Sequence, residues 1–364
     1  MDDVSGTLRQ PELARGPVAP EHLDEPAASR SAADSLRRRL DLLPAGHPSS
    51  PYDADGRARP PVARLPELAA EEPDEDEGTG PDHSPDDAAR PLTDSEWSEH
   101  VTEIRASLEK AHANGLATDH QYTIDAGGEA WVRSRRLAHK TILNDLYQRH
   151  SAVPCEHKAI VAGGLGGAGK STVLEKHASI DRSEYLTINP DDIKEELAAR
   201  GLVPEVAGLS PMEASDLVHE ETSYLAKQVA LLALADGKNV IWDITMSSRT
   251  STERRITELR AAGYSRIDAV FVDIPVETSV QRADARHRAG HDEYRAGHGL
   301  GGRFVPHDVI RAQQDSQLGS VNRKTFEDVK HRFDSWSRYD NSVNGRDAVL
   351  VEQSREKGLS EEAK

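Results

Sequence analysis

The chain has 364 residues, a formal net charge of -18 and one cysteine, Cys155. The length allows one large domain or two of ordinary size. The charge disfavours a nucleic-acid partner, and a single cysteine excludes an intrachain disulfide and a multi-cysteine zinc site. The first residues lack the basic start and apolar core of a signal peptide, and no apolar run is long enough to span a bilayer. We therefore expect a cytoplasmic protein with no membrane contact.

Residues 1–92 are predicted to form a disordered, acidic and proline-rich arm. This stretch contains a single aromatic residue, Tyr52, and a strongly acidic run from Glu71 to Asp87. Such a composition cannot bury enough apolar surface to offset the loss of chain entropy. Two interpretations stay open: a solvated tail, or an arm that docks onto a partner or inhibits the folded part.

A helical extension is expected over residues 93–153. Thr93–Glu96 supplies helix-capping residues and an acidic first turn, and Asn114–Gly115 ends this first helix. After a loop, a second helix is expected from about Glu129 to His150, with Leu137 on its apolar side. We expect this helix to pack on a catalytic core, and the alternative is a direct role in substrate binding.

Residues 154–352 alternate between strand and helix patterns, and a polar tail follows at 353–364. Strands are expected near residues 158–161, 185–188, 239–243, 266–273 and 347–351, and helices near 173–175, 193–197, 211–235, 251–262, 276–288, 306–318 and 322–333. Such alternation predicts an α/β fold, a three-layer P-loop kinase-like arrangement with a mostly parallel sheet.

The stretch KAIVAGGLGGAGKST, residues 158–172, fits the phosphate-loop pattern G-x-x-x-x-G-K-[ST] between a strand and a helix. Glycines let the backbone curl around a triphosphate, the lysine reaches the β- and γ-phosphates, and the serine hydroxyl ligates Mg²⁺. We predict binding of ATP or GTP with Mg²⁺. The predicted nucleotide-binding residues are Gly164, Leu165, Gly166, Gly167, Ala168, Gly169, Lys170, Ser171 and Thr172.

Ligands of parallel α/β sheets bind at the carboxyl ends of the strands. Asp191 follows the second predicted strand, where it could take the proton of an acceptor hydroxyl, or where it or Asp192 could cap the next helix. Asp243 ends the strand VIWD, where it could hold Mg²⁺, bind the acceptor or have a structural role. Thr245 and Arg249 are expected to line the same rim.

Arginines are suited to stabilise the charge that spreads over a phosphoryl group during transfer. Arg286 lies on the last predicted crossover helix, and Arg303 lies in a glycine-rich basic stretch, residues 288–303. The glycines of this stretch suggest a lid that closes over the nucleotide, and the alternative is a solvated basic loop.

The segments GGLGGAGKST, NPDDIKEEL and NVIWDIT, together with Arg286 and Arg303, resemble the zeta toxin family of toxin–antitoxin systems. The resemblance spans about Ala159–Leu318. It implies a P-loop kinase that phosphorylates the 3′-hydroxyl of UDP-N-acetylglucosamine, a nucleotide-sugar substrate, and an antitoxin protein as a partner.

The resemblance also implies roles for single residues. Lys170 and Asp191 match the family's lysine and catalytic aspartate. Arg286 and Arg303 match the arginines that hold the phosphates. Asp243 and Thr245 match the acidic residue and the threonine of a substrate-binding strand end.

Three departures fall on the acceptor side: Asn189 replaces an aspartate, Asp243 a glutamate and Ile244 a glycine. A further glutamate of the family aligns with Lys227, so Glu220 or Glu221 is expected to supply that carboxylate instead.

Other interpretations stay open. The acceptor could be an antibiotic, another metabolite or a polynucleotide end, although the acidic charge argues against the polynucleotide. The chain could instead be a nucleotide-switched binding or regulatory module that acts through its arm. The helices of residues 93–150 could also replace an antitoxin by packing beside the site.

Overall fold

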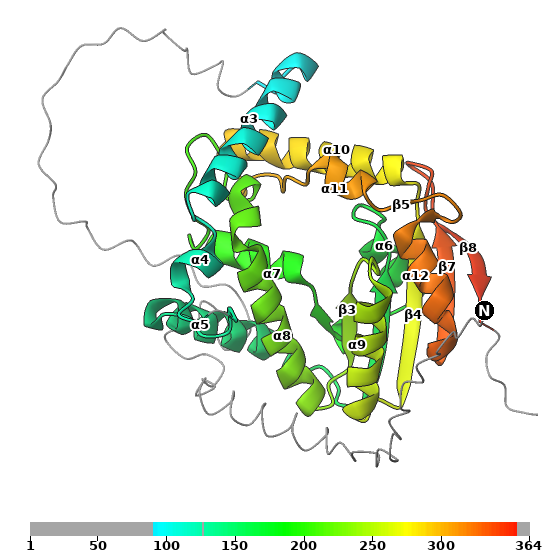
Figure 1. The fold of residues 1–364 in the computed structure, drawn as a ribbon. Coiled ribbons are helices and arrows are strands. Elements are labelled where there is room, and N and C mark those ends of the chain that lie inside the picture. The colour runs from blue at the N-terminus through cyan, green and yellow to red at the C-terminus, as the bar shows by residue number, and fades with distance from the viewer. Residues whose placement is uncertain (1–89, 126, 355–364) are drawn as a thin grey trace, which may run out of the picture.

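The computed structural model describes residues 90–125 and 127–354, and its centre is a six-stranded sheet with the order β2-β3-β1-β4-β7-β8 (Figure 1). The strands are β1 (Lys158–Gly163), β2 (Leu186–Ile188), β3 (Val240–Asp243), β4 (Arg266–Asp273), β7 (Ser335–Asp340) and β8 (Val349–Gln353). All neighbours pair in parallel except β7 and β8, which are antiparallel. The predicted α/β fold with a mostly parallel sheet is confirmed.

Helices cover the sheet, and three of those in the described residues precede its first strand in the sequence. The α-helices are α3 (Asp94–Ala113), α4 (Thr118–Tyr122), α5 (Arg133–Arg149), α6 (Lys170–Lys176), α7 (Pro190–Ala199), α8 (His219–Ala235), α9 (Arg249–Ala261), α10 (Val276–Arg295), α11 (His307–Arg311) and α12 (Val321–Val329). The 3-10 helices are η1 (Arg182–Glu184), η2 (Glu213–Val218) and η3 (Lys330–Arg332). No helix of the described ranges is both long and apolar enough to cross a membrane.

The alternation of side chains along β1 divides the core into two layers. Ala159 and Val161 pack with α5, α7, α8, α9 and α12, whereas Ile160 and Ala162 pack with α6, α10 and α11. Full burial of a valine or isoleucine side chain stabilises a fold by about 1.5–3 kcal/mol. Both faces of the central strand are therefore apolar, and the sheet is fixed by helices on each side.

Two differences from the sequence pattern lie near the C-terminus. β7 is not predicted, because SWSRYD is polar and only Tyr339 is fully buried. The helix expected over 306–318 is wrong beyond Arg311. There the chain forms a hairpin of β5 (Gln314–Asp315) and β6 (Gly319–Ser320), whose turn is held by Asp315 accepting from the amides of Gln317 and Leu318.

Two helices also differ in extent. The helix expected over 211–235 is divided into η2 and α8, and α10 continues to Arg295, into the stretch expected to form a lid. Within that stretch, Gly290 and Gly302 touch: a Cβ added to Gly290 would lie 2.6 Å from the Gly302 Cα. These two glycines allow the backbones of α10 and of the segment before Arg303 to pack closely.

The N-terminal extension begins as predicted. Thr93 and Glu96 form a reciprocal capping box at the start of α3. The loop that follows contains the short helix α4, and α5 begins at Arg133 rather than near Glu129. Leu137 is 57% exposed, so its predicted apolar role is wrong.

The predicted arm lies outside the described residues except for 90–92, and so does the predicted tail except for 353–354.

Candidate active site

The phosphate loop connects β1 to α6 and has a backbone that requires glycine. Gly164, Gly167 and Gly169 have φ angles of 137°, 73° and 81°. A Cβ on Gly164 would also lie 2.3 Å from the carbonyl oxygen of Val272. Larger residues are strained at positive φ, and the contact with β4 excludes even a methyl group at Gly164.

Three side chains from distant parts of the sequence hold this loop. The Ser279 hydroxyl donates to the Gly166 carbonyl at 2.6 Å, and the Arg282 guanidinium donates to the Gly167 carbonyl at 3.1 Å. The Asn341 amide donates to the Ala168 carbonyl at 2.8 Å. These donors fix the path of the loop from α10 and from the segment that follows β7.

Sequence reasoning missed these three contacts. Arg282 is one of the arginines of the predicted crossover helix, one helical turn before Arg286, but the sequence does not show that it contacts the loop backbone. Asn341 carries no signal in the sequence, because it reaches the loop only through β7, a strand that the sequence pattern does not predict.

Lys170 lies between the loop and the end of β3. Its ammonium group is 3.2 Å from the Asp243 carboxylate and donates to the Gly164 carbonyl at 3.2 Å. Burial raises the pKa of Asp243, the charge of Asp191 acts in the same direction, and Lys170 opposes both. Lys170, Asp243 and Asp191 therefore form one electrostatic group.

Asp191 is available because another residue caps its helix. Asn189 is the N-cap of α7, accepting from the Asp191 amide at 3.0 Å and donating to the Asp192 carboxylate at 2.9 Å. The expectation that Asp191 or Asp192 provides the cap is wrong. Asp191 instead forms an ion pair with Arg303.

Arg286 belongs to the same neighbourhood. Surrounding protein atoms lower the pKa of its guanidinium, the charge of Arg303 adds to that effect, and Asp191 and Glu195 oppose it. Five predicted residues thus lie near enough for their charges to interact: Lys170, Asp243, Asp191, Arg303 and Arg286.

Asp192 is a further site residue whose role sequence reasoning did not identify. Partial desolvation raises its pKa to about 6, and the charges of Glu195, Asp243 and Asp191 add to the effect. With Asn189 it lines a cavity of about 530 Å³ along β2 and α7, whose wall also includes Arg149 and Arg182. An open volume thus lies beside Asp192.

A family model described as Zeta toxin matches residues 144–344, more than half of the chain. The chain belongs to the zeta toxin family. No curated protein sequence matches this zeta toxin family member.

Solved structures resemble this zeta toxin family member at low identity. A crystal structure of AvrRxo1-ORF1:AvrRxo1-ORF2 with sulphate ions has 18% identity and a TM-score of 0.50, over 65% of this chain and 76% of that chain. The same complex with ATP has 16% identity and a TM-score of 0.49, with the same coverage. A structure from the PezAT toxin–antitoxin system of Streptococcus pneumoniae has 14% identity and a TM-score of 0.44, over 62% of this chain and 83% of that chain. The first match supports the fold alone.

The phosphate loop of this zeta toxin family member fits a nucleoside triphosphate. Its positive-φ glycines let the backbone curl so that several amides can face a ligand with many oxygen atoms. Ser171, exposed at the start of α6, and the Asp243 carboxylate offer the oxygen ligands that Mg²⁺ prefers.

Two other predicted substrate residues of the zeta toxin family member, Arg249 and Thr245, contact side chains outside the group around Asp243. Arg249 pairs with Glu253 at 3.1 Å and Asp328 at 3.8 Å, along α9 and toward α12. Thr245 is exposed beyond β3, and its hydroxyl donates to Ser247.

Neither glutamate of α8 is brought to the group around Asp243. Glu221 is fully buried and accepts from Arg135 at 2.6 and 2.7 Å and from His139 at 2.6 Å, so its expected substrate role is wrong. Glu220 is exposed.

Proposed function

We propose that this zeta toxin family phosphotransferase transfers the γ-phosphoryl group of ATP or GTP to a small-molecule hydroxyl, the 3′-hydroxyl of UDP-N-acetylglucosamine. One observation carries the proposal: the phosphate-loop Lys170 and Asp191, in the first turn of α7, both act on Asp243, and Arg303 pairs with Asp191. Groups suited to nucleotide and acceptor thus meet at the carboxyl ends of β1, β2 and β3.

The proposed roles follow from the chemistry of these side chains. Lys170 binds the β- and γ-phosphates. Asp191 accepts the proton of the acceptor hydroxyl at a carboxylate oxygen while that hydroxyl attacks the γ-phosphorus, and the bond from the γ-phosphorus to the β–γ bridging oxygen breaks to release ADP or GDP. Arg303 and Arg286 stabilise the negative charge on the transferred group. Mg²⁺, held by Ser171 and Asp243, supplies further neutralisation of phosphate charge when bound.

The cavity beside Asp192 supports a bulky acceptor. Its volume of about 530 Å³ falls in the usual range for small-molecule sites. Its wall carries Arg149 and Arg182 together with the carboxylates of Asp192, Glu195 and Glu196, so it offers polar groups of both charges to a hydroxylated acceptor. The proposal therefore assigns this cavity to the acceptor.

A toxin of this kind also needs restraint. Membership of the zeta toxin family supports an antitoxin protein as a partner and the cytoplasm as the place of action, and both are part of the proposal.

The test uses Asp191→Asn with labelled ATP and a panel of nucleotide sugars and other hydroxylated metabolites. Loss of a general base slows a reaction by about 10²–10⁴-fold. We expect phosphate transfer to UDP-N-acetylglucosamine to fall by that factor, while nucleotide affinity is retained. The control is Glu258→Gln, which removes one charge from the exposed face of α9.

Two results would contradict the proposal. Transfer by Asp191→Asn at the parental rate would exclude Asp191 as the base. Transfer by the parental protein to another member of the panel, with none to UDP-N-acetylglucosamine, would overturn the acceptor and leave the kinase reaction standing.

A further inference from the structure

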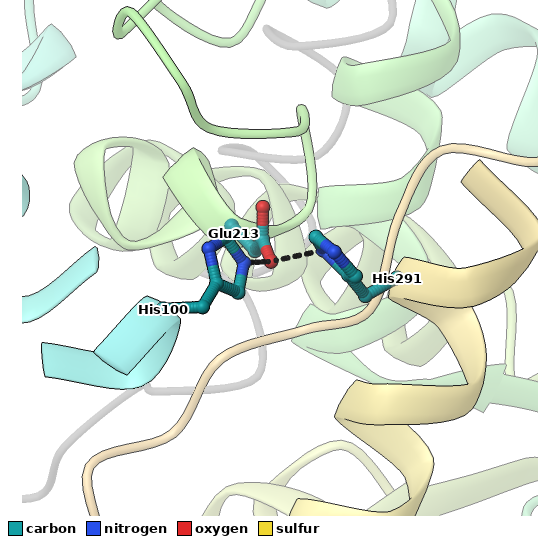
Figure 2. A group of neighbouring side chains, drawn as sticks. All are labelled: His100, Glu213 and His291. Carbon is teal, nitrogen blue, oxygen red and sulfur yellow. Dashed lines mark hydrogen bonds and ion pairs between the residues drawn. The ribbon is translucent and has the colours of Figure 1, made fainter. Parts of the chain in front are cut away.

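Three histidines surround one carboxylate oxygen away from the phosphate loop. His100 Nε2 lies 2.9 Å from Glu213 Oε1, and His287 Nε2 and His291 Nδ1 each lie 3.0 Å from the same atom. Figure 2 shows His100 and His291 pointing at Glu213 from opposite sides. The residues come from α3, η2 and α10, so three separate segments meet at this point.

The group is enclosed. Glu213, His287 and His291 are 1%, 2% and 7% exposed, and the side chain of His100 is 14% exposed. The Trp97 ring covers it, with its centroid 4.6 Å from that of His287 and 5.6 Å from that of His291. A low-polarity cover of this kind strengthens any charge interaction inside it.

Hydrogen bonding alone is a poor account of this arrangement. A carboxylate oxygen offers two lone pairs, so three imidazole donors aimed at one oxygen exceed its capacity. In the described chain, His291 Nε2 is buried without a partner, and such a group costs about 1–3 kcal/mol. The interactions at the centre must offset that cost.

A divalent cation accepts such a set of donors. The ligand atoms of His100, Glu213 and His291 lie within 4.8 Å of one another. Imidazole and carboxylate groups in a four-ligand set suit Zn²⁺, whereas Mg²⁺ and Ca²⁺ prefer oxygen ligands throughout. We propose that His100, Glu213 and His291, with a water molecule as the fourth ligand, bind one Zn²⁺ ion that fastens α3 to α10.

Binding requires a small rearrangement. Zinc–nitrogen bonds measure about 2.0–2.1 Å, so the ion takes the centre where Oε1 now lies and the carboxylate withdraws to become a ligand. The other oxygen, Oε2, stays bound to the amide and hydroxyl of Ser210, each at 2.8 Å, and orients the glutamate. Each coordinating histidine binds as a neutral imidazole through the nitrogen that now faces Oε1, with its one ring proton on the other nitrogen.

The test uses the full-length protein, stripped of metal with a chelator and then supplied with Zn²⁺ alone. We expect one zinc per chain by elemental analysis and a rise in melting temperature on zinc addition. Co²⁺ in place of zinc should give the intense visible absorption of a tetrahedral site. Both measurements on the parental protein decide the proposal even if a variant fails to fold.

His100→Gln and His291→Asn place an amide donor near the position of the lost ring nitrogen and remove a metal ligand. Each should weaken zinc binding by at least about 100-fold, because loss of a ligand weakens binding more than loss of a group that only orients a ligand. The control is His112→Gln, an exposed histidine of the same helix that pairs with Asp216 at 3.0 Å, which should bind zinc as the parent does. Less than one zinc per chain in the parent, or full binding by both ligand variants, would overturn the site.

Discussion

Asn189 determines what Asp191 can do. A helix N-terminus leaves backbone amides unsatisfied, and an aspartate in the first turn is often used to satisfy them. Here the Asn189 side chain caps α7, so the Asp191 carboxylate is left for Arg303. An aspartate could cap equally well, but it could not donate to the Asp192 carboxylate as the Asn189 amide does at 2.9 Å, so the asparagine at this position has a structural reason.

Asp192 should make stability depend on pH. Its pKa in the folded chain is about 6, against 3.8 as the ordinary value, so folding favours the protonated form. Its ionisation therefore destabilises the fold increasingly as pH rises from about 4 to 6, and this penalty is constant above about pH 7. Since the side chain is exposed, solvent screening limits the penalty to about 1 kcal/mol.

Asp192→Asn removes this penalty and keeps an oxygen that can accept from Asn189. The variant should match the parent near pH 4 and exceed its free energy of unfolding by about 1 kcal/mol at pH 8. Denaturant titrations of both proteins at the two pH values would measure this. An equal difference at both values would show that Asp192 does not titrate in this range.

At the scale of elements, the buried ion group between α5 and α8 should be a major determinant of stability. Glu221 lies between Arg135 and His139 with no exposed surface, so Glu221→Ala leaves the arginine buried without its partner. Breaking such a pair costs about 3–5 kcal/mol. Denaturant unfolding should show that loss.

The preceding residue, Glu220, provides the control. Glu220→Ala changes an exposed glutamate of the same helix turn and should alter stability by no more than about 0.5 kcal/mol. Equal effects from the two variants would contradict the assignment of Glu221 to the core.

The crossing of α10 and the segment before Arg303 should control phosphate transfer. A Cβ on Gly302 would lie 1.9 Å from the His287 carbonyl oxygen, so Gly302→Ala must push the two backbones apart. The displacement moves Arg303, and a shift of about 1 Å can reduce a rate by about 10²-fold. We expect kcat to fall while nucleotide affinity, set by the loop at Lys170, is retained.

Gly297→Asn is the matched change in the same stretch. Gly297 has a φ of 82° and open space around its Cα, and asparagine tolerates that conformation. Its kcat should equal that of the parent. A normal kcat for Gly302→Ala would show that the close crossing does not position Arg303.

The sequence predicts those elements whose signals are local. The phosphate loop is recognised from adjacent residues, and β4 has the predicted bounds Arg266–Asp273 because it contains four consecutive apolar residues, 269–272. Long-range contacts are not visible in this way. Arg135 is buried only because Glu221 faces it, and β7 is a strand because β4 and β8 pair with its polar sequence.

At the scale of the whole molecule, the N-terminal extension and the kinase core are held together by polar contacts as well as by packing. Figure 1 shows α3 crossing α10 near the C-terminal end of that helix. Arg288 pairs with Asp94 at 2.7 Å, and the Trp97 indole donates to Asp284 at 3.2 Å. The helix that carries Arg286 is thus contacted by the phosphate loop at one end and by α3 toward the other.

The sheet order makes the two halves of the site unequal in rigidity. β1 is paired on both sides, whereas β2 has three residues, lies at the edge and pairs only with β3 among the described strands. Short edge strands open at a lower free energy than central ones. Backbone amides of residues 186–188 should therefore exchange with deuterated water faster than those of residues 159–162, as mass spectrometry can measure.

Equal protection of the two strands would contradict this expectation. If it holds, gentle heating should free the Asp191 side of the protein before the Lys170 side. Such a partly opened molecule would still retain its nucleotide after losing the ability to use it.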